Sequence, residues 1–391
     1  MLVVVAPGQG SQVPGFLEPW LAIPRVLDRM RWLSAVAGID LIAHGTTSDA
    51  ETIKDTAIAQ PLLVAAGMVS LLEIFPHPSE AYAKIGAGAG HSVGEITVAG
   101  GSGIISAEQA MVFVRERGKA MAAAAATTAT GMTAVLGGDS DVVSAHLLSL
   151  GITPANINGA GQIVAAGTIE QLDSLDANPP AGAKLRRLQV AGAFHTSHMQ
   201  PAVHVLSDYS RAISTHDARV PIISNADGQV VRNGREFLGR LVSQVSNPVR
   251  WDLCMQTMQD MGVTALIELP PAGTLAGLAK RALPDVEILT IKSPDDLAAA
   301  ADLIDRHGKP SESANEPTWR LVVAPAKGTF RRAGEAGEFA AGSPIGTITS
   351  LRDTIDIITP HSGVVVEWLA QDGDPVNPGQ GILRLHPIGQ S

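Results

Sequence analysis

One five-residue segment, Gly90-His91-Ser92-Val93-Gly94, has the residue types and spacing of a serine nucleophile. It fits Gly-x-Ser-x-Gly, in which a sharp turn between a strand and a helix presents the serine hydroxyl above a sheet. The glycines leave room for that strained backbone, and the N-terminus of the following helix stabilises a developing oxyanion. Because the chain contains 40 glycines, the pattern alone leaves one alternative, a glycine-rich turn with an idle serine.

A second glycine-rich loop, Pro7-Gly8-Gln9-Gly10-Ser11-Gln12, follows an apolar run at the start of the chain. If this loop lies beside the serine, the backbone N–H of Gln9 can form an oxyanion hole together with the N–H of Val93. The alternative is an ordinary loop. A dinucleotide-binding loop is excluded, because Gly-x-Gly-x-x-Gly counted from Gly88 needs glycine where the chain has Val93.

The elements that must position these residues follow an α/β pattern. Leu2-Val3-Val4-Val5 predicts a fully buried strand, and a short segment over 83–87 leads into the serine loop. Residues 59–75 have apolar positions at helical spacing, with Pro61 expected in the first turn. A second helix is expected over 94–100, and Ser106-Ala107-Glu108-Gln109 has the spacing of a capping box at the start of a third.

From about residue 127 to residue 190 the pattern changes to short strands separated by helical stretches near 140–150 and 168–176. The expected strands contain Thr133–Leu136, Gln162–Ala166 and Lys184–Val190. This predicts a small βαββαβ-like insertion. The α/β pattern then returns through Pro221–Ser224 and Ala265–Leu269.

The composition limits the classes of function. The formal net charge of −10 argues against nucleic-acid binding, which needs a basic surface. The single cysteine, Cys254, has no partner for an internal disulfide and is expected on the packed face of a helix. Pro7 and Gly8 interrupt the apolar N-terminus before a signal peptide could form, and no run was expected to reach the length that spans a bilayer. We therefore expect a soluble, cytoplasmic protein with no membrane partner.

The last part of the chain has a different character. Residues 305–318 are polar and nearly free of apolar side chains, which predicts a linker, and residues 319–391 contain only short β-like runs bounded by Gly and Pro. Within this module Pro325-Ala326-Lys327-Gly328 recurs as Pro360-His361-Ser362-Gly363, and Gly342-Ser343-Pro344-Ile345 recurs as Gly379-Gln380-Gly381-Ile382. Two similar halves imply a pseudo-symmetric β structure.

Six motifs in one order resemble the malonyl-CoA:acyl carrier protein transacylases, over roughly residues 1 to 295. They are Gly8–Gln12, Gly90–Glu95, Arg117-Gly118-Lys119-x-Met121, Gly192–Thr196 with Met199, Pro248–Trp251 and Leu269–Leu275. The resemblance implies an α/β-hydrolase-like acyltransferase core over residues 1–304, with a ferredoxin-like subdomain inserted at about 127–190. The expected fold class is therefore α/β, followed by a small all-β domain.

The same resemblance assigns roles to single residues. Ser92 is the implied nucleophile and His195 its general base, oriented by main-chain carbonyl groups near Arg250 rather than by an aspartate. Arg117 is the implied ligand of the malonyl carboxylate, because a guanidinium can form two parallel hydrogen bonds with it. From the residue type alone, an ordinary surface arginine that caps or pairs on a helix is the favoured interpretation of Arg117, because most arginines are solvated. Further implied substrate-binding residues are Phe194, Met121 and His91.

The implied reaction is a ping-pong transfer of malonyl from malonyl-CoA to the phosphopantetheine thiol of acyl carrier protein, for fatty-acid or polyketide synthesis. Phe194 resembles the residue of malonyl-selective members and is expected to disfavour methylmalonyl. Because carrier proteins are acidic, a basic landing area is expected. The candidates are Lys184, Arg186 and Arg187, or Lys280 and Arg281. Two alternatives stay open: a serine thioesterase or acyltransferase of other specificity, and a non-catalytic scaffold.

Residues 319–391 resemble the biotinyl/lipoyl carrier domain, through the repeated Pro motifs and Asp372-Gly373-Asp374-Pro375. In that family a lysine before the second Pro motif is modified, but this chain has Arg352 at that position, and the module's only lysine, Lys327, lies in the wrong turn. A guanidinium cannot be acylated as an amine can. No biotin, lipoate, other cofactor or metal is therefore expected, and the module is expected to dock on a fatty-acid synthase or carboxylase component.

Overall fold

The structure is a computed structural model that describes residues 1–309, 320–334, 337–350 and 353–387. The chain divides into two compact units, residues 1–314 and residues 315–391.

The first unit is built around a six-stranded sheet in the order β11-β10-β1-β2-β7-β8. Its strands are β1 (Leu2–Ala6), β2 (Ile85–Gly90), β7 (Ile222–Ile223), β8 (Val230–Val231), β10 (Ala265–Glu268) and β11 (Glu287–Thr290). All neighbours pair in parallel except β7 and β8. The predicted first strand is thus confirmed, and it lies near the middle of the sheet. Ala6 is paired with Gly90, so the loops that follow β1 and β2 leave the same edge side by side.

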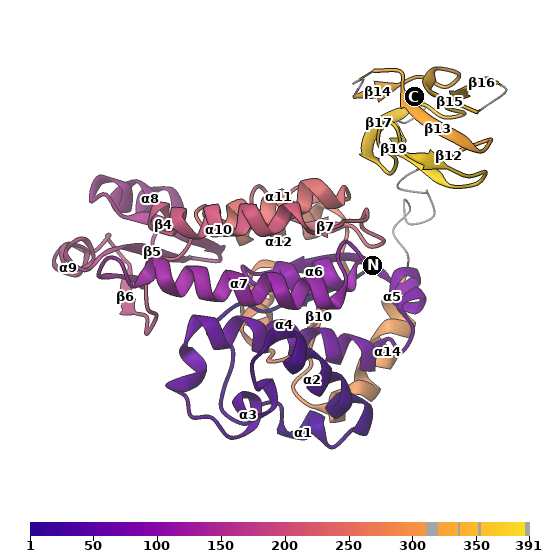
Figure 1. Cartoon of the computed structure of the whole chain (residues 1–391). Helices are drawn as coiled ribbons and strands as arrows, with labels where there is room; N and C mark the ends of the chain where they lie inside the picture. The colour runs from indigo at the N-terminus through magenta and orange to yellow at the C-terminus, as the bar shows by residue number, and fades with distance from the viewer. Residues whose placement is uncertain (310–319, 335–336, 351–352, 388–391) are drawn as a thin grey trace. The chain divides into compact units, whose positions relative to one another are not determined.

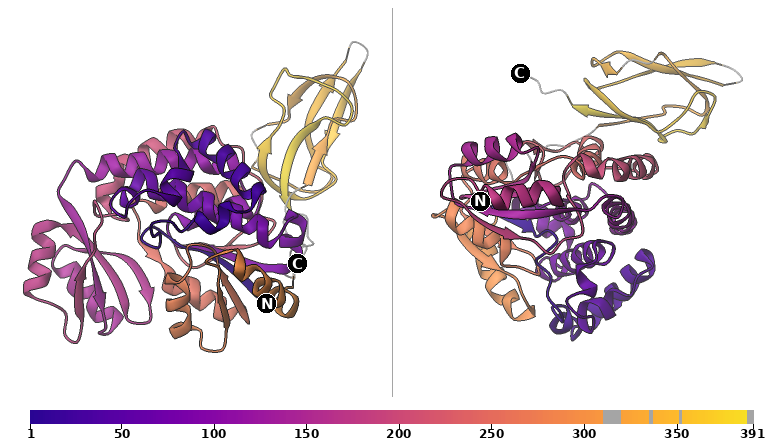
Figure 2. Two further views of the ribbon diagram at one scale, coloured as in Figure 1. Left: turned by 90° about the horizontal axis from the view of Figure 1, so that it is seen from below. Right: turned by 90° about the vertical axis from the view of Figure 1, so that its left-hand side faces the viewer.

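Helices cover both faces of this sheet, because β1 alternates its buried side chains between two clusters. Leu2, Val4 and Ala6 pack into the larger cluster and Val3 and Val5 into the smaller one. The larger cluster receives α2 (Pro24–Ala37), α3 (Leu41–Thr46), α4 (Thr56–Ile74), α6 (Gly94–Gly101), α7 (Ala107–Ala125), α10 (Gln200–Arg211), α11 (Gly234–Gln244) and α14 (Leu297–His307). The smaller receives α12 (Trp251–Asp260) and α13 (Thr274–Ala282). Figures 1 and 2 show this layering.

The remaining short helices lie in the connections. They are α1 (Glu18–Leu21), η1 (Thr52–Lys54), α5 (Pro78–Lys84), η2 (Ser197–Met199) and η3 (Pro294–Asp296). Cys254 is buried on α12, as expected from its neighbours.

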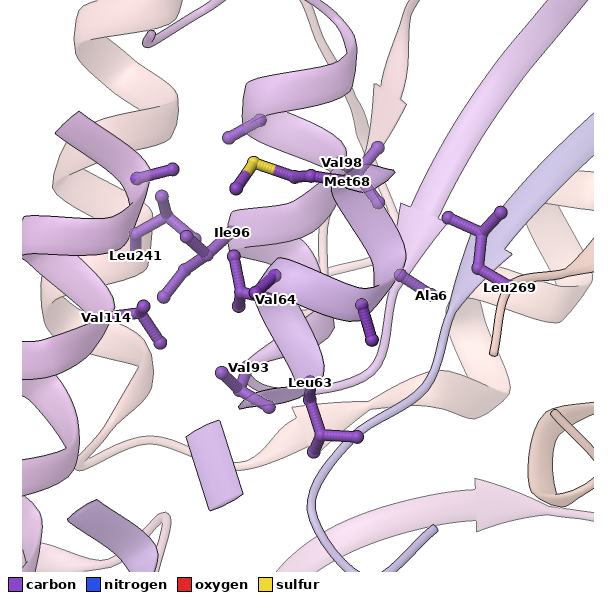
Figure 3. Close-up of a cluster of buried hydrophobic side chains, with 14 of the residues drawn as sticks. Ala6, Leu63, Val64, Met68, Val93, Ile96, Val98, Val114, Leu241 and Leu269 are labelled. Carbon is purple, nitrogen blue, oxygen red and sulfur yellow. The ribbon is translucent and has the colours of Figure 1, made fainter. Parts of the chain in front are cut away.

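The larger cluster reaches the serine loop itself. Val93, next to Ser92, and Ile96 of α6 lie among Val64, Val114 and Leu241, side chains of three different helices (Figure 3). The helix that follows the serine is therefore held by apolar packing. A rigid support of this kind is what an active-site turn requires.

Helix α4 corrects two expectations. It begins at Thr56, where Asp55 caps it, so Pro61 lies inside the helix and not in its first turn. The 19-residue helix is also long and apolar enough to cross a membrane, which contradicts the expectation that no run reaches that length. Most of α4 is buried inside the first unit, however, and it is apolar on all sides because it is the central helix of the larger cluster.

Residues 130–187 form a separate lobe at the left of the first unit in Figure 1. Its elements are β3 (Thr130–Leu136), α8 (Ser140–Ser149), β4 (Thr153–Gly159), β5 (Gln162–Thr168), α9 (Ile169–Ala177) and β6 (Lys184–Arg187). The predicted order of strands and helices is confirmed, although the last strand ends at Arg187 rather than Val190. The sheet has the order β6-β3-β5-β4-β9, and β9 (Val249–Arg250) comes from the returning chain.

The predicted start of the linker at residue 305 is wrong. Helix α14 continues to His307, because Ala300, Leu303 and Ile304 are buried and Arg306 pairs with Asp302 and Glu287. Residues 310–318 of the predicted linker lie outside the described residues.

The second unit consists of two four-stranded antiparallel sheets, β12-β19-β17-β14 and β16-β15-β13-β18. Its strands are β12 (Arg320–Val323), β13 (Gly328–Arg332), β14 (Glu338–Phe339), β15 (Pro344–Thr349), β16 (Thr354–Ile358), β17 (Gly363–Trp368), β18 (Pro375–Val376) and β19 (Gly381–Pro387). A single apolar cluster that includes Phe330, Phe339 and Ile382 holds them together.

The internal repeat of the second unit has a structural counterpart. A Cβ atom on Gly328 would lie 2.6 Å from the Thr349 carbonyl oxygen, and one on Gly363 would lie 2.5 Å from that of His386. These carbonyls belong to β15 and β19, which pair with β13 and β17 respectively. The two repeated glycines thus meet equivalent neighbours in the two halves. Arg352, which replaces the expected lysine, lies outside the described residues.

Candidate active site

Ser92 lies in a tight turn between β2, which ends at Gly90, and α6, which begins at Gly94. Its φ angle is +53°, a left-handed backbone conformation that residues other than glycine rarely adopt. A Cβ atom on Gly90 would lie 2.0 Å from the carbonyl carbon of Gly94, and one on Gly94 would lie 2.2 Å from the Ala6 carbonyl oxygen. The strand, turn and helix thus fall where the Gly-x-Ser-x-Gly spacing predicts, and both glycines are sterically required.

His195 is brought to Ser92 from a distant part of the sequence. The Ser92 Oγ and His195 Nε2 atoms are 2.7 Å apart, and His195 Nδ1 lies 2.8 Å from the main-chain oxygen of Gln244. Because a carbonyl oxygen can only accept, Nδ1 carries the proton and Nε2 accepts from the serine hydroxyl. Burial, and then the nearby Arg117 cation, lower the pKa of His195 to about 3, so the imidazole is neutral at pH 7.

Main-chain groups orient the ring, as expected. One belongs to Asn247, three residues before Arg250, and the other is the carbonyl of Gln244, the last residue of α11. The side chain of Arg250 instead pairs with Asp252 at 2.8 Å. His195 itself has a φ angle of +60°, so both members of the pair have strained backbones.

The loop after β1 lies against the turn after β2, because the two strands are adjacent and in register. The His91 N–H donates to the Ala6 carbonyl at 3.0 Å, and the Gln9 side chain is fixed by the Lys54 carbonyl and the Thr56 hydroxyl. Within the part of the chain that the structure describes, the backbone N–H groups of Gln9 and Val93 donate to no other residue. Both are available to a ligand.

Arg117 is a fully buried cation, with 1% of its surface exposed. Its guanidinium donates to Gln60 Oε1 at 2.6 Å, Gln244 Oε1 at 2.8 Å and Ser92 Oγ at 3.3 Å, whereas its Nε has no partner among the described residues. No carboxylate of the described residues makes an ion pair with it. Burial lowers the pKa of Arg117 to about 10, so it stays charged at pH 7.

This arrangement excludes the reading of Arg117 as a surface arginine. A buried cation held only by neutral groups is costly unless an anion joins it. One of its nitrogens, Nη2, lies 3.3 Å from the Ser92 hydroxyl oxygen. The site is therefore built to hold a negatively charged group next to the nucleophile.

The other expected substrate-binding residues fall into two groups. Phe194 and Met121 are buried in the larger cluster near the pair, and Met121 accepts from Gln60 through its sulfur. His91 points away from the Ser92 hydroxyl, because its Nε2 lies 2.9 Å from Asn158 Oδ1 of the inserted lobe and its ring packs on Trp251. His91 nevertheless lines the cleft between the serine loop and the inserted lobe.

A cleft with a volume of about 600 Å³ lies between the serine loop and the inserted lobe. Gln9, His91, Asn158, Gln189 and Arg281 are among the residues that line it. Of the two expected basic groups, Lys280 and Arg281 are exposed at the end of α13, and Arg281 is part of the cleft wall.

The other basic group lies on β6 of the inserted lobe. Lys184 and Arg186 are exposed there, but Arg187 pairs with Asp173 and Asp176, both at 2.7 Å. Within the described residues, no cluster of three or more His, Cys, Asp or Glu side chains is arranged to hold a metal ion.

Sequence reasoning missed three amides and one acid that surround the nucleophile. Gln60, Asn225 and Gln244 are buried, and all three contact Ser92, Arg117 or the turn that holds them. The sequence predicted no role for Glu95 beyond its place in the motif Gly90–Glu95, but its carboxyl group is buried beneath the serine turn. The one signal in the sequence was Gln60, a polar residue within the apolar run 59–75. A polar side chain that is buried in such a run needs a hydrogen-bond partner.

Comparison with known proteins agrees with this geometry. The model of the acyl transferase domain family matches residues 3–301. The malonyl CoA-acyl carrier protein transacylase of Mycobacterium tuberculosis is 46% identical over 308 residues, which are 78% of this chain and 100% of that protein. The enzyme of the same name from Escherichia coli is 32% identical over 307 residues, covering 76% of this chain and 98% of the other.

Solved structures are similar over the same region. The crystal structure of the Mycobacterium tuberculosis enzyme matches with a TM-score of 0.74 and 46% identity, covering 77% of this chain and 99% of the other. A malonyl-transacylase solved in complex with a type II polyketide acyl carrier protein matches with a TM-score of 0.71 and 28% identity, with 77% and 99% covered.

Proposed function

The chain belongs to the malonyl-CoA–acyl carrier protein transacylases of the acyl transferase domain family, and we propose that Ser92 carries the malonyl group between the two thiols. As a member it transfers malonyl to acyl carrier protein for fatty-acid or polyketide synthesis. The observation that carries the residue assignment is the buried Arg117 cation at 3.3 Å from Ser92 Oγ, itself 2.7 Å from the base His195.

In the first half-reaction, His195 Nε2 takes the hydroxyl proton of Ser92 while Oγ attacks the thioester carbonyl of malonyl-CoA. The N–H groups of Gln9 and Val93 hold the oxyanion of the tetrahedral intermediate. When the C–S bond breaks, the imidazolium returns its proton to the CoA sulfur, and malonyl remains as an ester on Ser92. The Gln244 carbonyl keeps Nδ1 protonated throughout.

The second half-reaction reverses these steps. His195 takes the proton of the carrier's phosphopantetheine thiol, the sulfur attacks the malonyl ester, and the Ser92 oxygen leaves and regains a proton. The proposed steps use no metal or cofactor. Arg117 binds the malonyl carboxylate in both halves, beside the nucleophile that its Nη2 already contacts at 3.3 Å. We assign Phe194 and Met121 to the wall of the acyl pocket, which disfavours an α-methyl group.

The carrier protein is the partner, and we place its docking area at Lys280 and Arg281. Both are exposed at the end of α13, and Arg281 lines the cleft that also contains Gln9 and His91. The alternative group on β6 is weakened because two aspartates pair with Arg187. An acidic carrier bound at α13 could deliver its thiol along the cleft, and His91 would contact the arm there.

Two finer assignments complete the proposal. We assign residues 127–190 to a ferredoxin-like subdomain, supported by the order β6-β3-β5-β4 with α8 and α9. We assign residues 319–391 to a biotinyl/lipoyl-like barrel-sandwich, supported by two sheets with equivalent halves. Because Arg352 stands at the modified position, we propose that it carries no biotin or lipoate and docks on a synthase or carboxylase component in the cytoplasm.

Intact-mass measurement after incubation with malonyl-CoA tests the assignment of Ser92. The wild type should gain the mass of one malonyl group and lose it when carrier protein is added, with malonyl then found on the carrier. Ser92→Ala should gain none, with a loss of transfer of at least about 10⁴-fold. Equal gains in both proteins would refute the acyl-enzyme, and release of free malonate instead of transfer would favour a thioesterase.

A further inference from the structure

Gln244 contacts the proposed nucleophile, its base and the buried cation. Its main-chain oxygen accepts from His195 Nδ1, its Oε1 accepts from Arg117, and its Nε2 donates to the Ser92 carbonyl oxygen at 3.1 Å. An amide has a donor end and an acceptor end of nearly equal size. The site works only if Oε1 faces Arg117, because the reverse orientation would set two donors against each other.

Glu95 favours the same orientation as Arg117 and the Ser92 carbonyl oxygen do. Its carboxylate lies beneath the serine turn with 1% of the residue exposed, and one of its oxygens accepts from Gln244 Nε2. The other oxygen accepts the Asn225 N–H at 2.6 Å. Asn225 in turn accepts from the Ser92 N–H and donates to the Gly90 carbonyl, which fixes both sides of the turn. Each carboxyl oxygen keeps a lone pair whether the acid is ionised or protonated, so both oxygens can accept, and the amide nitrogen of Gln244 faces one of them.

We propose that Glu95 is a positioning residue for acyl selectivity: its carboxyl group orients the Gln244 amide, which holds the Arg117 guanidinium towards the acyl group beside Ser92. Glu95 does not touch the substrate. The inference rests on the proposed function, because it names what orients the residue that recognises malonyl.

The surroundings of Glu95 fit this role rather than a simple ion pair. Arg117 approaches it from α7 but contacts Gln244 instead of the carboxylate. Arg240 of α11 lines the same cavity of about 430 Å³ as Glu95 and Gln244, yet it pairs with Asp227 and Glu236. Cys254 of α12 is a buried thiol. Burial raises the pKa of Glu95 to about 8 in spite of its two N–H donors.

The side chain in Glu95→Gln has nearly the shape of glutamate, but an NH₂ group that can only donate replaces one of the two oxygens. Its oxygen must still accept the buried Asn225 N–H, so its NH₂ group faces Gln244 Nε2. Gln244 must then turn over, which places its NH₂ against the Arg117 guanidinium and removes the bond to the Ser92 carbonyl. The Arg117 guanidinium then loses the hydrogen bond that fixes its orientation. The hydrogen bond from His195 Nδ1 to the main-chain oxygen of Gln244 is kept, because it does not involve the Gln244 side chain.

The test compares acylation of Ser92 by malonyl-CoA and by acetyl-CoA in the full chain, as the ratio of the two kcat/KM values. In Glu95→Gln this ratio should fall at least about 10-fold, mainly through a higher KM for malonyl-CoA. The matched control is Glu73→Gln, which removes another buried carboxylate, one that pairs with Arg25 and Arg29 far from the cleft. Its ratio should stay within about twofold of the wild type, even if the melting temperature falls.

A double-mutant cycle shows whether Glu95 acts through Gln244. Gln244→Met keeps the main-chain carbonyl and should lower the ratio as Glu95→Gln does, and the double variant should lower it no further. If Glu95→Gln does not fold, Glu95→Met removes the carboxylate without adding a donor and must still lower the ratio. An unchanged ratio, or a further fall in the double variant, overturns the inference. A wild type that takes no malonyl refutes the proposed function instead.

Discussion

The two units of the chain differ in how many polar side chains they bury. The first buries ionisable residues around its serine, including Glu95, Arg117 and His195, and neutral amides such as Asn225 and Gln244. Among the described residues of the second unit, the only buried polar side chain is that of Thr359. Burying such groups is unfavourable unless each has a partner, so they persist where chemistry needs a dry, fixed environment.

This contrast separates two kinds of functional evidence. In the first unit the function is visible in the interior, as strained dihedral angles and a cation without a carboxylate partner. In the described part of the second unit the interior is ordinary apolar packing, and we expect its role to lie on its surface. If the contrast is correct, substitutions should matter most at the buried site, less at the exposed rim of the cleft, and least in the second unit.

Arg117→Ala should give the largest effect among these tests of binding groups. It removes two or more charge-assisted hydrogen bonds to the malonyl carboxylate, so kcat/KM for malonyl-CoA should fall on the order of 100-fold. Acetyl-CoA has no such carboxylate, and its kcat/KM should change far less. The measurement is the rate of Ser92 acylation by each donor, with Arg115→Ala, on the same helix and paired with Glu116, as the matched control. Equal losses for both donors would remove the carboxylate role.

Charge reversal at Lys280 and Arg281 should give an intermediate effect. Because both residues are exposed, their attraction for an acidic carrier is partly screened by water and salt. We expect the double change to Glu to slow transfer from pre-formed malonyl-enzyme to the carrier by about 10-fold at low salt, and by less at high salt.

The matched control for this docking area is the same double change at Lys184 and Arg186, exposed on the inserted lobe. Single-turnover measurement with pre-loaded enzyme keeps the binding of malonyl-CoA out of the comparison. A larger loss in the control than at α13 would move the docking area to the inserted lobe.

The sequence predicted most of the architecture, because its signals were local. The buried first strand, the capping box at Ser106 and the βαββαβ order of the insertion all depend on patterns within a few residues. The errors were also local. Asp55 starts α4 earlier than the apolar pattern does, and three buried apolar residues carry α14 beyond the point where the chain becomes polar.

The site was predictable only in part. Ser92 and the Gln9 loop could be paired from sequence because adjacent parallel strands end at one edge of a sheet. The residues that orient them could not, because Gln60, Asn225 and Gln244 are single amides far apart in the chain, with no spacing that marks them. Their role follows from burial and partner atoms, which only the folded chain specifies.

Removal of the second unit should have the smallest effect on malonyl transfer. The 46%-identical relative from Mycobacterium tuberculosis is matched over its whole length by 78% of this chain, so its fold needs no counterpart of residues 315–391. A chain of residues 1–314 should therefore transfer malonyl to free carrier protein with kcat/KM within about twofold of the full chain. Adding residues 315–391 as a separate protein should change nothing. A loss of 10-fold or more, restored by adding the second unit, would show that a unit with no buried chemistry still serves the reaction, and it would break the contrast between the two.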